Sequence, residues 1–335
     1  MTRKRRAPRA LLGTSFALAL ALALLVLAGC SAVPTPTDTA ALTPPSVEEW
    51  SWATTGWSLN TEADAPYMDR PPANLTSRDL DDTGLAIYYE RNSDKVRADH
   101  PVVYAQYGIS ALIEYERTGQ KQWLERAARQ AEQLVTMHTE RGDGWWYPYS
   151  FDWTYDDRTL TAPWWSGMAQ GQALSLFSRL AQVTGDEQWA TAADHTWASF
   201  RQEPSASEPW STFIDDEHLW FEEYAGDQPP LMVLNGQIFA IFGLYDYWRL
   251  TQDPEVARYV DGGATTVLSI MPEIRNAGDI SYYCVQVDFC ARARWQDQKY
   301  HVIHSWQLNT LAKLTGDPQF SEWADQLESD WQPAA

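Results

Sequence analysis

Four stretches of this sequence repeat one short pattern: Thr118-Gly119-Gln120, Thr184-Gly185-Asp186, Thr251-Gln252-Asp253 and Thr315-Gly316-Asp317. They start 66, 67 and 64 residues apart, and each separates an apolar helical stretch from an amphipathic one. Glycine readily adopts the left-handed conformation that ends a helix, and aspartate caps the helix that follows. Each copy therefore predicts two helices joined by a short turn.

The repeated hairpins also predict the fold class. Helix pairs can bury their apolar faces only by packing against neighbouring pairs. Pairs of this length with long connecting loops favour an all-α fold, an incomplete (α/α) barrel or toroid of about four helix hairpins over residues 100–331. The more apolar first helix of each pair would lie inside. A linear solenoid is the alternative, although its repeats are usually shorter and more regular.

The first 47 residues read as a targeting region. Residues 1–29 have the basic start and apolar centre of a signal peptide. Leu27-Ala28-Gly29-Cys30 is a lipobox-like site at which Cys30 would be lipidated, and residues 30–47 form a Pro/Thr-rich tether. The alternative is a retained anchor, since the apolar run approaches the roughly 20 residues that span a bilayer. We expect an extracytoplasmic protein, lipid-anchored to the outer face of a bacterial cell membrane.

Three further segments read as extended. Residues 48–99 predict an N-terminal segment with a β-hairpin over the barrel mouth, because Leu85-Ala86-Ile87-Tyr88-Tyr89-Glu90 alternates weakly between polar turns. Gly142–Tyr155 and Asp279–Phe289 read better as strands or irregular loops than as helices.

The composition limits the partners. A formal net charge of −20 argues against nucleic acid and against bulk electrostatic capture of a polyanion. An acidic polymer would need a local cluster of cations, and the membrane would be contacted through the lipid anchor alone. The 18 Trp and 16 Tyr suit stacking on sugar rings, but they also suit a large helical core.

Two cysteines besides Cys30 lie six residues apart, at Cys284 and Cys290. In an oxidising compartment this spacing allows a disulfide that closes a short loop. Two buried free thiols are the alternative.

Polar and aromatic residues recur at the start of every predicted inner helix. Such a ring is either a hydrogen-bonded structural network or a binding site, and four independent copies favour the site. Glu222 and Glu223 also suit a helix N-terminus, and Tyr224 suits a buried core phenol. The substrate-binding candidates are Tyr104, Gln106, Trp165, Gln170, Asn235, Arg292, Arg294, His301 and His304. We expect no metal, because no third ligand motif accompanies the two histidines.

Three blocks in this order resemble the C-terminal domain of D-glucuronyl C5-epimerases. They are PWWSGMAQGQAL at 163–174, EEY at 222–224 followed by VLNG and GLYD, and ARW followed by YHxxH at 300–304. Those enzymes invert C5 of glucuronic acid in heparan-type polysaccharides, and their domain is an incomplete (α/α) barrel. Larger family members carry a long β-rich region before the barrel, which a second subunit of a homodimer could replace here.

The resemblance implies four catalytic residues and no cofactor. Glu223 and Tyr224 match the EEY pair, and Tyr300 matches the tyrosine before HxxH. Tyr283 matches a tyrosine in the preceding loop of the family, although the neighbouring Tyr282 is an alternative match. Epimerisation removes a proton beside a carboxylate and returns one from the opposite face, so it needs acid/base groups and neutralisation of the developing charge.

We therefore expect a C5-epimerase that acts on D-glucuronate in an extracellular uronic-acid-containing polysaccharide. Arg292 and Arg294 are the expected partners of the uronate carboxylate. A polysaccharide lyase shares the first proton abstraction. A glycoside hydrolase would pair Glu223 with Asp216 or Asp157, and a non-catalytic surface glycan-binding lipoprotein is the last alternative.

Overall fold

The computed structural model describes residues 50–90, 95–292 and 297–333. The predicted signal peptide, Cys30 and the tether lie outside these residues. No helix within the described ranges is long and apolar enough to span a membrane.

Four helix hairpins form the domain, as the repeat predicts. Their eight helices are α1 (Pro101–Thr118) with α2 (Lys121–Met137), α3 (Gly167–Thr184) with α4 (Glu187–Phe200), α5 (Leu234–Thr251) with α6 (Pro254–Ile274), and α8 (Gln298–Thr315) with α9 (Gln319–Asp330). One short further helix, α7 (Val287–Arg292), lies in the loop before α8.

The four turns repeat in atomic detail. Gly119, Gly185 and Gly316 take left-handed backbone angles at the ends of α1, α3 and α8, and Gln252 does so after α5. The threonine before each of them donates its hydroxyl to the carbonyl four residues earlier, as Thr184 does to Leu180 at 2.7 Å. In the last three copies the aspartate after the turn accepts a backbone N–H of the next helix, as Asp186 does from Gln188 at 3.1 Å. Gln120 stands at this position in the first copy and forms no side-chain cap. The repeat is therefore a helix stop, a turn and a helix start.

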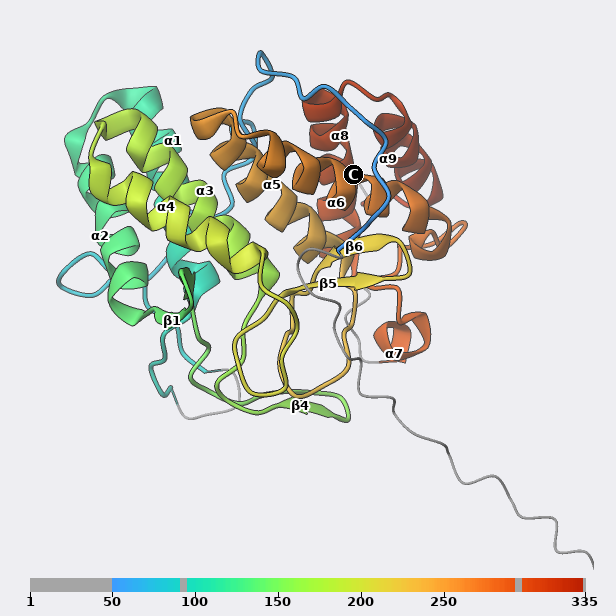
Figure 1. Cartoon of the computed structure of the whole chain (residues 1–335), viewed down its shortest axis with the longest axis horizontal. Coiled ribbons are helices and arrows are strands. Elements are labelled where there is room, and N and C mark those ends of the chain that lie inside the picture. The colour runs from blue at the N-terminus through green and yellow to red at the C-terminus, as the bar shows by residue number, and fades with distance from the viewer. Residues whose placement is uncertain (1–49, 91–94, 293–296, 334–335) are drawn as a thin grey trace, which may run out of the picture. The chain divides into compact units, whose positions relative to one another are not determined.

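The first helix of each pair lies inside. α1, α3, α5 and α8 follow one another, with α3 and α5 packed together at the centre, and α2, α4, α6 and α9 cover them from outside. α5 is buried from Leu234 to Trp248, whereas the buried residues of α2 are confined to one face. Figure 1 shows α1 and α8 at opposite ends of this row. The predicted incomplete (α/α) barrel is confirmed.

Short hairpins gather at one end of the helices. They are β1 (Thr139–Arg141) with β2 (Gly144–Trp146), β3 (Trp153–Tyr155) with β4 (Arg158–Leu160), and β5 (Thr212–Asp215) with β6 (His218–Phe221), all antiparallel. They arise in the loops that lead into α3 and α5, so they lie near the N-terminal ends of the inner helices, as Figure 1 shows.

The N-terminal segment, residues 50–90, crosses the opposite end. Its β-structure consists of isolated antiparallel bridges, such as Leu80 with Ala86, while Tyr88 reaches the end that carries the hairpins. Tyr67 is only 1% exposed and packs against Phe239, Phe242 and Trp306, so it fills the centre between the inner helices.

A buried ion pair on the inner helices holds the N-terminal segment in place. The Arg179 guanidinium lies 2.8 Å from the Asp246 carboxylate, which joins α3 to α5. Arg179 also donates to the carbonyl of Pro66 at 2.5 Å and lies over the Tyr67 ring. Charges buried this deeply need full pairing. The N-terminal segment is therefore part of the barrel core.

Candidate active site

All four inner helices open onto one cavity of about 690 Å³ at their N-terminal ends. The loops before α1, α3 and α5 and the N-terminal segment complete its walls. The helix residues that line it are Val102, Val103 and Gln106 of α1, Met168 of α3, Asn235 and Phe239 of α5, and Lys299, Tyr300, Ile303 and Trp306 of α8. Glu223 and Tyr224 line it from the loop between β6 and α5.

Glu222 holds this loop in place. Its side chain is 0% exposed, and its carboxylate accepts the backbone N–H groups of Tyr224, Leu231 and Met232 at 2.9, 3.1 and 2.9 Å. Burial raises the pKa of Glu222, and the three N–H groups oppose that change. Glu222 does not line the cavity, so its task is to shape the loop that carries Glu223 and Tyr224.

Glu223 lies at the N-terminus of α5 and faces the cavity. The Tyr283 hydroxyl donates to its Oε1 at 3.3 Å, and Asn235 Nδ2 lies 3.5 Å from its Oε2. Burial, aided by the negative charge of Glu222, raises the pKa of Glu223 to about 8, against hydrogen bonds from Tyr224 and Tyr283. A carboxylate with such a pKa can take up and release a proton near neutral pH.

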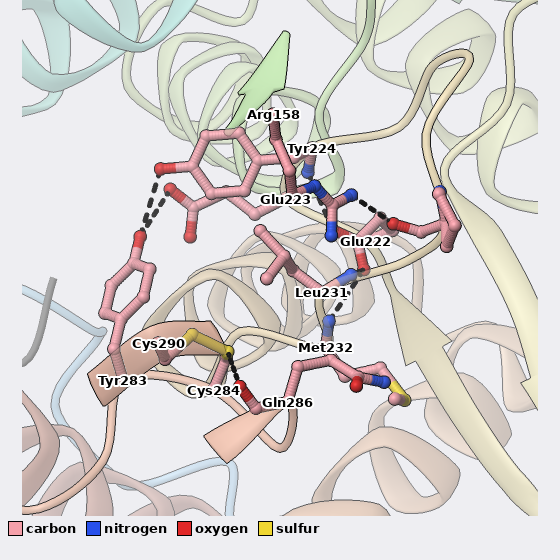
Figure 2. The surroundings of a disulfide bond; sticks show 11 residues. Arg158, Glu222, Glu223, Tyr224, Leu231, Met232, Tyr283, Cys284, Gln286 and Cys290 are labelled. Carbon is pink, nitrogen blue, oxygen red and sulfur yellow. Dashed lines mark hydrogen bonds between the residues drawn. A yellow bond between two sulfur atoms is a disulfide. The ribbon is translucent and has the colours of Figure 1, made fainter. Parts of the chain in front are cut away.

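Three tyrosines surround this carboxylate. The hydroxyls of Tyr224 and Tyr283 are 3.1 Å apart, and the rings of Tyr283 and Tyr300 are 4.6 Å apart. Figure 2 shows the Tyr283 hydroxyl pointing at both Tyr224 and Glu223. Burial, with the nearby Glu223 charge, raises the pKa of Tyr224 and Tyr283 well above the ordinary value. Both phenols therefore stay protonated and can act as proton donors.

A disulfide anchors the loop that presents Tyr283. Cys284 and Cys290 are bonded to each other, which favours the first of the two sequence interpretations. Cys284 forms an antiparallel bridge with Val233, and the Tyr283 carbonyl accepts the N–H of Leu234 at 3.2 Å. Tyr283 is therefore attached to the residues that begin α5, beside Glu223.

An aromatic wall faces the tyrosines. Tyr149 and Trp164 stack with ring centroids 3.8 Å apart, and Trp164 continues to Tyr224 at 6.0 Å. The predicted sugar contact was the next residue, Trp165, which does not line the cavity. Successive residues of an extended segment point to opposite sides. Trp164 and Trp165 pair their backbones with Tyr149 and Ala225 respectively, so only Trp164 faces the cavity.

Three cations line the cavity that sequence reasoning did not select: Arg70, Arg78 and Lys299. Within the described ranges none of them forms an ion pair. The side chains of the predicted arginines, Arg292 and Arg294, lie outside the described residues. One sequence feature could have identified Arg70 as a site residue: it precedes Pro71 and Pro72, which restrict the backbone of the segment.

Four other predicted contacts serve the fold around the cavity. The Tyr104 hydroxyl donates to Asp99 at 2.6 Å, and Gln170 bonds to Trp145, Tyr147 and Ser199. His301 accepts the N–H of Ser281 through Nδ1 at 2.9 Å and meets the carbonyls of Leu327 and Trp331 through Nε2. His304 contacts the Ser281 hydroxyl at 2.9 Å, and burial lowers its pKa to about 3, so it is neutral. None of the four lines the main cavity.

No group of three or more His, Cys, Asp or Glu within the described residues could hold a metal ion. The two carboxylates considered for a hydrolase, Asp157 and Asp216, are exposed at the tips of the β3–β4 and β5–β6 hairpins. Neither lines the cavity with Glu223.

The fold and the site define an (α/α)-barrel protein with a carboxylate and tyrosines at the mouth of the barrel. Residues 139–329, more than half of the chain, match the family model described as D-glucuronyl C5-epimerase C-terminus. The chain belongs to the D-glucuronyl C5-epimerase family.

One relative and one solved structure illustrate the likeness. A D-glucuronyl C5-epimerase of Caenorhabditis elegans is 26% identical over 212 residues, which are 58% of this chain and 33% of that protein. This chain thus spans about a third of that relative's length. A crystal structure of D-mannose isomerase is 12% identical, with a TM-score of 0.54 over 78% of this chain and 68% of that one. At that identity it shows the fold alone.

Proposed function

We propose that this protein is a carbohydrate epimerase that inverts C5 of D-glucuronate residues in a uronic-acid-containing polysaccharide. One observation carries the proposal: the cavity combines Glu223, whose pKa is raised to about 8, with protonated tyrosines and with cations that form no ion pair with any described residue. A cavity of about 690 Å³ is large enough for a sugar ring, and its stacked aromatic wall suits one face of that ring.

The chemistry assigns a task to each group. The ionised Glu223 takes the proton from C5, and the electron pair left at C5 delocalises into the adjacent uronate carboxylate. Arg70, Arg78 and Lys299 stabilise the added negative charge, since cations placed where charge develops lower the barrier. Tyr300, which comes from α8 rather than from the loop of Glu223, returns a proton to the opposite face of C5. Tyr283 holds Glu223 in position, and Tyr224 bonds to Tyr283.

The proposal includes the cellular location of the protein. The basic and apolar start of the chain and the cysteine at position 30 support export and lipid anchoring at the outer face of the membrane. A tethered enzyme of this kind would meet polysaccharide outside the cytoplasm. The Pro/Thr-rich residues 31–47 would separate the barrel from the membrane.

Hydrogen exchange tests the activity directly. The protein is incubated in deuterated water with a heparan-type polymer that contains glucuronate, and NMR follows deuterium at C5 and the appearance of iduronate. Exchange without chain cleavage is expected. An unsaturated product absorbing in the ultraviolet would instead identify a lyase, and a new reducing end would identify a hydrolase. Polymer binding without exchange would leave a glycan-binding protein.

Matched tyrosine variants test the assignment. Tyr300→Phe should lower the exchange rate by about 100-fold, a typical contribution of one acid/base group. Tyr283→Phe should also lower the rate, because Glu223 loses the hydroxyl that holds it in position. Tyr282→Phe is the control, because the hydroxyl that bonds to Glu223 and Tyr224 belongs to Tyr283 and not to its neighbour Tyr282. An unchanged rate in Tyr300→Phe would remove Tyr300 from the proton transfer.

A further inference from the structure

The loop that carries Tyr283 is bonded to two inner helices. The Tyr283 carbonyl accepts the N–H of Leu234 at the start of α5. Ser281, two residues before Tyr283, donates its N–H to Nδ1 of His301 on α8 at 2.9 Å. His301 directly follows Tyr300 in the sequence. The bond from Ser281 therefore links the chain segment of Tyr283 to that of Tyr300.

The His301 ring is held in one orientation. Its Nε2 lies 3.0 Å from the Leu327 carbonyl and 3.1 Å from the Trp331 carbonyl, at the end of α9. A carbonyl oxygen can only accept, so Nε2 carries the proton and Nδ1 has the lone pair that accepts the N–H of Ser281. His301 is 1% exposed, and the Trp331 ring packs edge-on against it with the centroids 5.4 Å apart. The ring thus connects α9 to the loop.

His304, one turn further along α8, adds a second contact to the same serine. The Ser281 hydroxyl lies 2.9 Å from Nδ1 of His304 and 3.0 Å from Nδ1 of His301. Burial keeps His304 neutral, so its Nδ1 can accept the hydroxyl proton. None of the three is among the described residues that line the main cavity. The cluster can therefore affect the reaction through the position of the loop and of α8.

The place of α8 in the barrel makes such a link important. α8 lies at one end of the row of inner helices, and it packs on α5 much less extensively than α3 does (Figure 1). The rings of Tyr283 and Tyr300, which come from different elements, are nonetheless 4.6 Å apart. Misplacing a reacting group by about 1 Å can cost about 100-fold in rate, so transfer of protons on both faces of C5 requires a fixed spacing.

We infer that His301 is a positioning residue: its bonds to Ser281 set the distance between the two tyrosine rings. The inference rests on the proposed function, since that function assigns the tasks of Tyr283 and Tyr300. It gives the histidine pair of α8 an effect on catalysis without contact with substrate or metal.

Two substitutions at His301 separate its two sets of bonds. Asparagine places its amide oxygen near the position of Nδ1, so His301→Asn keeps the bond from Ser281 and loses those to α9. Glutamine places its amide nitrogen near the position of Nε2, so His301→Gln keeps the bonds to α9 and loses the one from Ser281. His301→Gln should lower kcat for C5 exchange about tenfold with KM unchanged, whereas His301→Asn should stay within about twofold of the wild type.

NMR of the full chain with labelled tyrosines measures the spacing independently of activity. Rings 4.6 Å apart give a nuclear Overhauser cross-peak between Tyr283 and Tyr300, which the Tyr283→Phe and Tyr300→Phe variants assign. The cross-peak should disappear in His301→Gln and persist in His301→Asn. Thermal unfolding checks that each variant is folded.

The outcomes separate the positioning role from the proposed activity. A folded His301→Gln protein with wild-type kcat and cross-peak would overturn the inference, as would equal losses in both His301 variants. If His301→Gln does not fold, Ser281→Ala takes its place, because it removes the hydroxyl contacts to both histidines. A weaker cross-peak in Ser281→Ala would support the inference, and one of wild-type intensity would overturn it.

The wild type completes the comparison. Cross-peaks that respond to the variants as expected, without C5 exchange in the wild type, would uphold the role of His301 and refute the epimerase. C5 exchange with a cross-peak that neither substitution at His301 changes would do the reverse.

Discussion

A Cβ atom placed on Gly236 would lie 2.4 Å from Oε2 of Glu223. The absence of a side chain at Gly236 therefore allows the Glu223 carboxylate to pack against the start of α5. Gly236→Ala should displace Glu223 and lower the epimerisation rate on the order of 100-fold, because small displacements of a catalytic group have effects of this size. NMR exchange at C5 measures the rate.

A second substitution should partly restore the stability of the Gly236→Ala variant. Shortening the acid in Gly236→Ala/Glu223→Asp relieves the contact with the carboxylate but keeps the Cβ of residue 223, which lies 2.8 Å from the added atom. The double variant should therefore unfold at a higher temperature than Gly236→Ala alone, though below the wild type. A Gly236→Ala protein with wild-type exchange and wild-type unfolding would show that the contact does not constrain Glu223.

Glu222→Gln should change the pH dependence as well as the rate. The negative charge of Glu222 helps to raise the pKa of Glu223, so its removal lowers that pKa. If ionised Glu223 is the base, the rising limb of the pH–rate profile moves to lower pH. The variant also puts an amide beside three N–H donors, which costs on the order of 1–3 kcal/mol of stability. A lower rate with an unmoved profile would limit Glu222 to a structural role.

Glu223→Gln should flatten the pH dependence of stability. The pKa of Glu223 is about 8 in the fold against an ordinary value of 4.5. Between these values the folded chain keeps a proton that the unfolded chain has lost, so the free energy of unfolding falls as pH rises and levels off above 8. Denaturant unfolding at pH 5 and at pH 8 measures how much the free energy of unfolding decreases between these two pH values. The decrease should be smaller in Glu223→Gln than in the wild type, by on the order of 1–3 kcal/mol. Glu125→Gln is the control: Glu125 is exposed on α2, so this variant should show the same decrease in the free energy of unfolding as the wild type.

Arg78→Gln should weaken substrate binding. A cation that bonds to a carboxylate contributes about 1.5–3 kcal/mol, so the KM for the uronate polymer should rise about tenfold or more. The salt dependence of binding should also become less steep, because one ionic contact is lost. Arg117→Gln provides the control, since Arg117 is exposed on α1 and pairs with Glu114 at 2.6 Å. Equal effects of the two substitutions would argue against a specific role for Arg78.

The turn repeat predicts opposite effects at two equivalent positions. Gln252 has a φ of 55°, in the left-handed region that costs a non-glycine residue about 1 kcal/mol. Gln252→Gly should therefore stabilise the protein, and Gly185→Ala, with a φ of 69° and open space around its Cα, should destabilise it by a similar amount. Chemical denaturation measures both. Changes of the same sign would contradict the role of the left-handed turn.

The helix hairpins could be predicted because their information is local. Thr184, Gly185 and Asp186 act within one turn of chain, so the same physical roles recur wherever the pattern occurs. The ring of polar residues could be predicted for a related reason: inner helices that begin at one end of a barrel bring their first turns together. Gln106, Asn235 and Tyr300 line the cavity on that account.

The remaining site residues depend on contacts that the sequence does not encode locally. Trp164 and Trp165 differ only in which side of an extended segment they occupy, and bridges to Tyr149 and Ala225 decide it. His301 resembles a ligand in sequence, but it bonds to Ser281 and to the end of α9. Arg70 belongs to the N-terminal segment, and only the path of that segment across the barrel brings it to the cavity.

That path has a consequence for how the protein is made. Thr55 bonds to Asp261 across 206 residues of sequence, and Asn60 bonds to Lys313 across 253. During synthesis the segment emerges first, yet its partners on α6 and α8 emerge last. Contacts of such long range slow folding, since the chain between them must be ordered before they form. The earliest part of the domain to leave the ribosome is therefore expected to be the last to dock, and Tyr67 enters the barrel centre only then.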